Sequence, residues 1–116
     1  MPSRTTGSIV ASPSFEVAAT IDPVVHKVIA EFLRSSPALI AKLREAAARG
    51  DASAIRALAH NVKGTSATLG AVALSHRCAE LEDLSRSGSV ADATARVAAI
   101  ENLYAEARTA LEAEVA

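Results

Sequence analysis

Apolar residues recur every three or four positions through most of this 116-residue chain, which is the spacing of one face of an α-helix. The clearest stripes are Ile55, Ala59, Val62, Ser66 and Leu69, then Leu74, Cys78, Leu81 and Ser85, then Val97, Ile100, Tyr104, Ala107 and Leu111. Half of the residues are hydrophobic, but only 3% are aromatic and 27 are alanine. This composition favours helices packed through small and aliphatic side chains, and no alternating pattern predicts a strand.

Proline and glycine mark where the helices should begin and end. Asp22-Pro23 and Ser36-Pro37 are typical helix starts, because proline at the first helical position loses no intrahelical hydrogen bond. Glycines at positions 50, 70 and 88 can adopt the left-handed conformation that ends a helix. We therefore predict five helices, at residues 23–35, 37–49, 52–69, 71–87 and 90–113.

The connections between these helices are short, so consecutive helices should run antiparallel. The expected fold is all-α: an antiparallel up-down-up-down four-helix bundle with a short additional N-terminal helix. The bundle domain would span residues 21–116. Residues 1–20, which contain several Ser and Thr, would form a flexible N-terminal extension.

Charge and cysteine content narrow the classes of partner. Twelve Lys and Arg residues nearly balance thirteen Asp and Glu residues, and the formal net charge of −1 argues against binding nucleic acid or an anionic membrane surface through bulk charge. No apolar run is long enough to cross a bilayer. Cys78 is the single cysteine and cannot form a disulfide within the chain, so the composition favours a cytoplasmic protein.

One histidine stands apart from the apolar stripe of the helix predicted at residues 52–69. Because a helix advances about 100° per residue, His60 lies roughly 140° and Gly64 roughly 180° from the centre of that stripe, and both should face solvent. Arg56 and Lys63 flank the histidine with positive charge. Glycine inside a helix costs about 1 kcal/mol relative to alanine, so Gly64 suggests a need for close approach to the imidazole by another molecule.

An exposed imidazole of this kind suits phosphoryl transfer. It is largely neutral near pH 7 and offers a ring nitrogen as nucleophile. The Lys63 ammonium disfavours protonation of the ring and can contact the oxygens of an arriving phosphoryl group. Phosphoryl transfer depends chiefly on positioning and on neutralising these oxygens, so a partner can supply the metal ion.

Residues 59–70, with the sequence AHNVKGTSATLG, resemble the signature of histidine-containing phosphotransfer (HPt) domains. The resemblance covers most of residues 22–111, including the segment 32–50 that resembles the helix placed before the histidine helix. Thr65 replaces a more frequent serine, and Glu82 stands where many members have Gln or Glu near the imidazole. The resemblance implies a four-helix bundle in which His60 accepts and donates the phosphoryl group.

The same resemblance implies roles for three further residues. Lys63 would stabilise the phosphoryl group, Gly64 would provide steric clearance, and Glu82 would orient the imidazole. A carboxylate close to His60 would also repel a phosphoryl group unless Lys63 lies between them.

The resemblance also implies the partners. In HPt proteins the phosphoryl group comes from the aspartate of a response-regulator receiver domain and passes to another receiver, with Mg²⁺ held by the receiver. We therefore expect receiver domains and a hybrid sensor histidine kinase as partners of a monomeric phosphotransfer protein. No cofactor or metal is expected on this chain, and the sequence has no glycine-rich ATP-binding motif, so it should not phosphorylate itself.

The partner surface should centre on His60 and include Ser53, Arg56 and Ala67. The alternative hypothesis is a non-catalytic helical adaptor that binds a receiver or a kinase without phosphoryl exchange. A metal site formed by His60, His76 and Glu82 is not predicted, because the spacing lacks the paired i, i+4 ligands typical of such sites.

Overall fold

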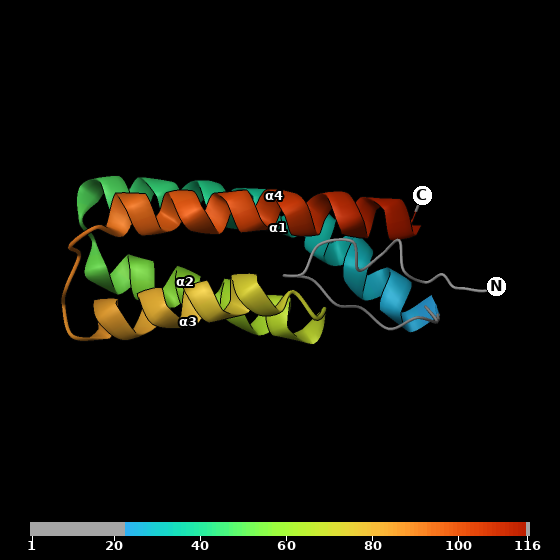
Figure 1. Ribbon diagram of the computed structural model, residues 1–116, viewed down its shortest axis with the longest axis horizontal. Coiled ribbons are helices and arrows are strands. Elements are labelled where there is room, and N and C mark those ends of the chain that lie inside the picture. The colour runs from blue at the N-terminus through green and yellow to red at the C-terminus, as the bar shows by residue number, and fades with distance from the viewer. Residues whose placement is uncertain (1–22, 116) are drawn as a thin grey trace.

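The computed structural model describes residues 23–115, which form four consecutive α-helices and no strand (Figure 1). The helices are α1 (Pro23–Arg49), α2 (Ala52–Thr68), α3 (Val72–Arg86) and α4 (Ala93–Val115). Helix α1 packs beside α4 and helix α2 beside α3, while contacts of α1 with α2 and of α3 with α4 join the two pairs. The prediction of an all-α antiparallel bundle is therefore confirmed. The extension expected at residues 1–20 lies outside the described residues.

A single helix, α1, takes the place of the two helices predicted at residues 23–35 and 37–49. The prediction of a separate N-terminal helix was wrong, because Pro37 lies inside α1 rather than at a helix start. A proline there deprives the carbonyl four residues earlier of its N–H donor and favours a bend. Figure 1 shows the first part of α1, in blue, slanting away from the line of the rest of the helix.

Contacts with α4 support α1 at this bend. The buried Ser36 hydroxyl donates to the carbonyl of Phe32 and lies 2.8 Å from the hydroxyl of Tyr104 on α4. The rings of Phe32 and Tyr104 also pack together, with centroids 6.0 Å apart and an angle of 60° between their planes. Tertiary packing therefore holds α1 continuous where the local sequence favours a break.

The core lies between the four helices, and every residue of the three predicted apolar stripes is buried in it. Helix α1 adds the apolar side chains Ile29, Phe32, Ile40, Leu43, Ala46 and Ala47. The two serines of the stripes bury their hydroxyls by donating to the carbonyl one turn earlier: Ser66 to Val62 and Ser85 to Leu81. Because α2 turns its apolar stripe toward this core, its opposite face is left at the surface.

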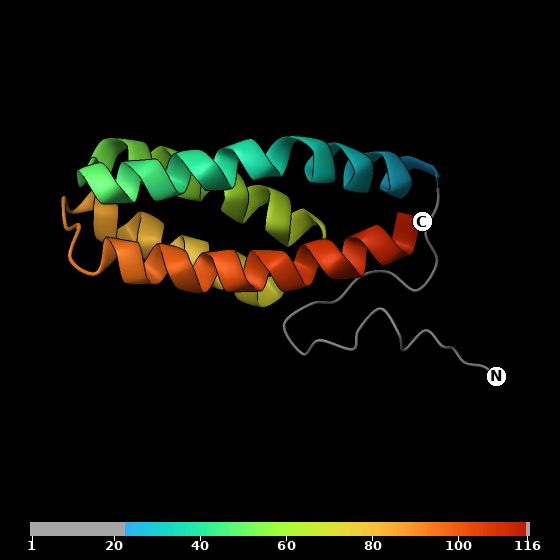
Figure 2. The same ribbon diagram turned by 90° about the horizontal axis from the view of Figure 1, so that it is seen from above.

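Short turns keep the helices antiparallel, as Figure 2 also shows. Gly50 and Gly70 have φ of 68° and 81°, and the residue after each glycine donates to a carbonyl five positions earlier. This arrangement is the Schellman motif, which satisfies carbonyls at a helix end. Asp51 then caps α2 by accepting a hydrogen bond from the backbone N–H of Ala54 at 3.1 Å.

Gly50 should be required for its backbone conformation. The nearest atom to a Cβ built on Gly50 is Cγ2 of Val90 at 3.9 Å, so a methyl group has room. The positive φ remains unfavourable for any L side chain, and we expect Gly50→Ala to lower the free energy of unfolding by about 1 kcal/mol. Urea denaturation followed by circular dichroism measures this change.

Gly64 provides the matched control, because it lies in regular helix and a Cβ there meets no other described residue within 4 Å outside its own stretch of helix. Gly64→Ala should raise the free energy of unfolding by about 1 kcal/mol. If Gly50→Ala and Gly64→Ala change the free energy of unfolding equally, the positive φ of Gly50 is not what requires glycine there.

Candidate functional site

His60 lies on the solvent-facing side of α2, opposite the residues that α2 buries. Its side chain is 67% exposed to solvent, whereas the adjacent Ala59 is completely buried. The other α2 residues proposed for the partner surface are exposed as well: Ser53, Arg56, Gly64 and Ala67. Since these positions recur every three or four residues, the structure brings them together with His60 in one stripe along α2.

Gly64 leaves bare backbone one helical turn after His60. Apart from the local backbone of α2, no atom of the described residues lies within 4 Å of the position that a Cβ would occupy, so tight packing among these residues does not require glycine there. The space beside the imidazole is therefore open on this side.

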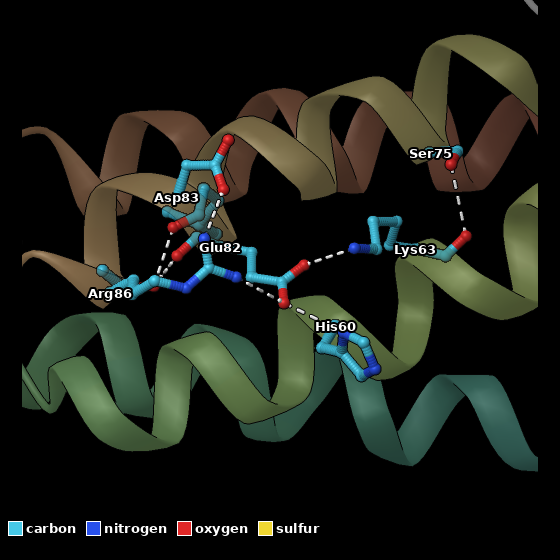
Figure 3. A network of polar contacts seen from close by, with 8 residues as sticks. His60, Lys63, Ser75, Glu82, Asp83 and Arg86 are labelled. Carbon is cyan, nitrogen blue, oxygen red and sulfur yellow. Dashed lines mark hydrogen bonds and ion pairs between the residues drawn. The ribbon is translucent and has the colours of Figure 1, made fainter.

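The carboxylate of Glu82 connects α3 to the histidine helix (Figure 3). Glu82 is only 6% exposed, and its Oε2 lies 2.9 Å from Nδ1 of His60. Its other oxygen, Oε1, lies 2.7 Å from Nζ of Lys63. An ionised carboxylate can only accept hydrogen bonds, so Nδ1 carries a hydrogen, and in a neutral imidazole the lone pair is then on Nε2. Figure 3 shows this second ring nitrogen pointing away from Glu82.

Glu82 is held in its ionised form. The hydrogen bond from Lys63 keeps the pKa of Glu82 below its ordinary value, and the contact with His60 lowers it further, although burial acts in the opposite direction. Ser75 secures the spacing of the two helices at this level, because its hydroxyl donates to the backbone carbonyl of Lys63 at 3.2 Å. The ammonium of Lys63 is thus paired with Glu82.

Two neighbouring residues of α3 belong to this cluster and were not identified from the sequence. Nη2 of Arg86 lies 3.3 Å from Oε2 of Glu82, and Nη1 of Arg86 lies 2.9 Å from Oδ1 of Asp83. The sequence signals were the i, i+4 spacing of Glu82 and Arg86 and the i, i+3 spacing of Asp83 and Arg86, and both spacings are common on helix surfaces. The pair of Glu82 and Arg86 differs from an ordinary surface pair because Glu82 is buried.

Comparisons with known proteins agree with this arrangement. The family model described as the Hpt domain matches residues 27–110. The chain belongs to the Hpt domain family. A solved structure, histidine-containing phosphotransfer protein B (HptB) from Pseudomonas aeruginosa PAO1, shares 33% sequence identity with a TM-score of 0.74, over 78% of this chain and 79% of that one. A search of curated protein sequences gives no significant match.

Membership of the Hpt domain family supports histidine phosphotransfer within a phosphorelay as the function of this chain. Nothing in the comparisons or the structure favours the alternative of a non-catalytic adaptor. The individual roles of His60, Lys63, Gly64 and Glu82 stay predictions.

Hollows lie beside α2 in the described part of the Hpt bundle. A hollow of about 340 Å³ is lined by Arg56, Ala57, His60 and Glu82. Another, of about 590 Å³, is lined by α1 residues between Lys27 and Ser35 and by Thr65 of α2. Within residues 23–115, no group of three or more His, Cys, Asp or Glu side chains is arranged to hold a metal ion, and no helix is long and apolar enough to cross a membrane.

The ionised state of Glu82 should contribute to stability in a pH-dependent way. Its pKa is lower in the folded protein than in the unfolded chain, so this contribution is complete at neutral pH and is lost as the pH falls below about 4.3, through the folded-state pKa. Glu82→Gln should therefore be less stable than the wild type at pH 7, and the difference should shrink in acid.

Chemical denaturation at several pH values tests this expectation. Glu80→Gln is the control, because Glu80 is an exposed carboxylate on the same helix that also pairs with an arginine. A stability difference between wild type and Glu82→Gln that is constant from pH 7 to pH 3 would contradict the ion-pair assignment.

Proposed function

We propose that His60 is the phosphoryl-carrying residue of this Hpt domain, which accepts the group from the aspartate of one receiver domain and passes it to the aspartate of another. The observation that carries the proposal is the contact between Nδ1 of His60 and the buried Glu82 carboxylate. This contact fixes the ring by one nitrogen and leaves the lone pair of the other available at the surface. A surface histidine without such a partner would be free to rotate.

The transfer step follows from this arrangement. The lone pair of Nε2 forms a bond to phosphorus while the bond between phosphorus and the aspartyl oxygen breaks, and that electron pair leaves with the aspartate carboxylate. Nδ1 keeps its hydrogen, so no proton has to move and the imidazole gains a positive charge. Glu82 stabilises this charge through its hydrogen bond to Nδ1. The second transfer reverses the same steps.

The surroundings of His60 suit the approach of a receiver domain. Lys63 would neutralise phosphoryl oxygens, and the open space at Gly64 would allow the partner's backbone to come close. Ser53, Arg56 and Ala67 would lie at the edge of the interface, and Arg56 also lines the hollow beside His60. Mg²⁺ would be held by the receiver rather than by this chain.

The wider setting follows from the same proposal. Receiver domains and a hybrid sensor histidine kinase would be the partners of a monomeric protein acting in the cytoplasm. The phosphoryl group would originate in the ATP-dependent reaction of the kinase, since we propose only transfer, and no ATP chemistry, for this chain.

His60→Gln should abolish labelling by a ³²P-phosphorylated receiver domain, because the amide has no nucleophilic nitrogen lone pair. His76→Gln is the matched control: His76 is also an exposed helical histidine, and its loss should leave labelling unchanged. In the wild type, the label should be acid-labile and base-stable, as expected for phosphohistidine. Undiminished labelling of His60→Gln would refute the proposal.

Gly64→Gln tests the clearance beside the imidazole. The added side chain projects into open space, so the fold should remain intact. We expect about a tenfold loss of affinity for the receiver, because bulk is inserted at the centre of the proposed interface. Isothermal titration calorimetry measures the affinity, and Gly64→Ala should lie between the wild type and Gly64→Gln. Wild-type affinity of the glutamine variant would count against close approach at this position.

A further inference from the structure

The two oxygens of Glu82 carry different partners. Oε1 is 2.7 Å from Lys63, while Oε2 is 2.9 Å from Nδ1 of His60 and 3.3 Å from Nη2 of Arg86. The carboxylate thus has two cationic partners, and Figure 3 shows them approaching from opposite sides, with Glu82 between them. His60 is the third partner, through Nδ1.

The proposed role of Lys63 conflicts with its position in the free protein. To contact the oxygens of an arriving phosphoryl group, the ammonium must leave Oε1 of Glu82. Glu82 is only 6% exposed, and loss of a cationic partner is strongly unfavourable for a buried carboxylate. Unless another cation remains, the release of Lys63 would either be suppressed or disturb the hydrogen bond to Nδ1.

We infer that Arg86 is a positioning residue for phosphotransfer: it holds the Glu82 carboxylate in place while Lys63 turns toward the phosphoryl group. The inference rests on the proposed function of His60 and Lys63. Because Arg86 binds the same oxygen that accepts from Nδ1, it preserves the orientation of the imidazole after Oε1 has lost its partner.

The geometry of Arg86 suits this role. A guanidinium carries several N–H donors in a fixed plane and stays charged at all physiological pH values. Here Nη1 contacts Asp83 at 2.9 Å while Nη2 contacts Glu82, so Asp83 holds the guanidinium in place. Since Arg86 approaches Glu82 from the side opposite Lys63, it acts on the reaction through Glu82 and not by touching the phosphoryl group.

Single-turnover transfer from a phosphorylated receiver to the full chain tests this role. Arg86→Gln should lower the maximal transfer rate about fivefold without changing the receiver concentration that gives half of that rate. Arg86→Lys should restore most of the rate because it keeps the charge. The matched control is Arg77→Gln, since Arg77 is 56% exposed against 55% for Arg86, lies on the same helix and also pairs with a carboxylate.

The Glu82→Gln background separates action through Glu82 from direct action. A neutral amide needs no cation, so adding Arg86→Gln to Glu82→Gln should slow transfer no further. If Arg86→Gln slows transfer fivefold in both the wild-type and the Glu82→Gln chain, the inference is overturned. It is also overturned if Arg86→Gln transfers at the wild-type rate, or if only the receiver concentration that gives half of the maximal rate changes. Wild-type chain that takes up no label at His60 would instead refute the proposed function, so the two failures are distinguishable.

Discussion

Burial of one face of α2 determines where every other residue of that helix points. Ile55, Ala59 and Val62 pack into the core, and burying each large aliphatic side chain contributes about 1.5–3 kcal/mol. The helix advances about 100° per residue, so this packing turns His60 and Gly64 outward whatever their own chemistry prefers. The exposure of the imidazole is therefore a consequence of hydrophobic packing and needs no contribution from the polar residues.

Packing alone does not orient the imidazole ring, and Glu82 supplies this second constraint. An exposed histidine can rotate about its side-chain bonds, whereas a hydrogen bond from Nδ1 to a buried carboxylate selects one rotamer and one tautomer. The carboxylate can be buried and ionised because Lys63 and Arg86 compensate its charge. Lys63, one of these two cations, is also the proposed partner of the arriving phosphoryl group.

Sequence periodicity predicted those features that depend on a single helix. The buried stripes, the ends of helices at Gly50 and Gly70, and the outward position of His60 all follow from residue spacing and glycine stereochemistry. Pro37 was misinterpreted because its local preference for a helix start is outweighed by packing of α1 against α4, which a local pattern does not contain.

The contacts of Glu82 could not be derived from periodicity for a related reason. They depend on how far α3 is rotated and shifted relative to α2, and spacing along one helix leaves both quantities undetermined. The resemblance to HPt domains indicated that Glu82 lies near the imidazole, but it gave no information on Arg86 or on the pairing of Lys63 with Glu82.

One residue next to His60 lowers the stability of the helix in which it lies. Gly64 weakens α2 by about 1 kcal/mol relative to alanine, although a methyl group there would touch nothing in the described part of the chain beyond its own stretch of helix. Gly50, by contrast, is explained by its positive φ. Departures from local stability that have no internal explanation are expected at functional sites. Because Gly64 lies one helical turn from the imidazole, this departure supports the proposal that His60 is the centre of the site more strongly than the exposure of the histidine does.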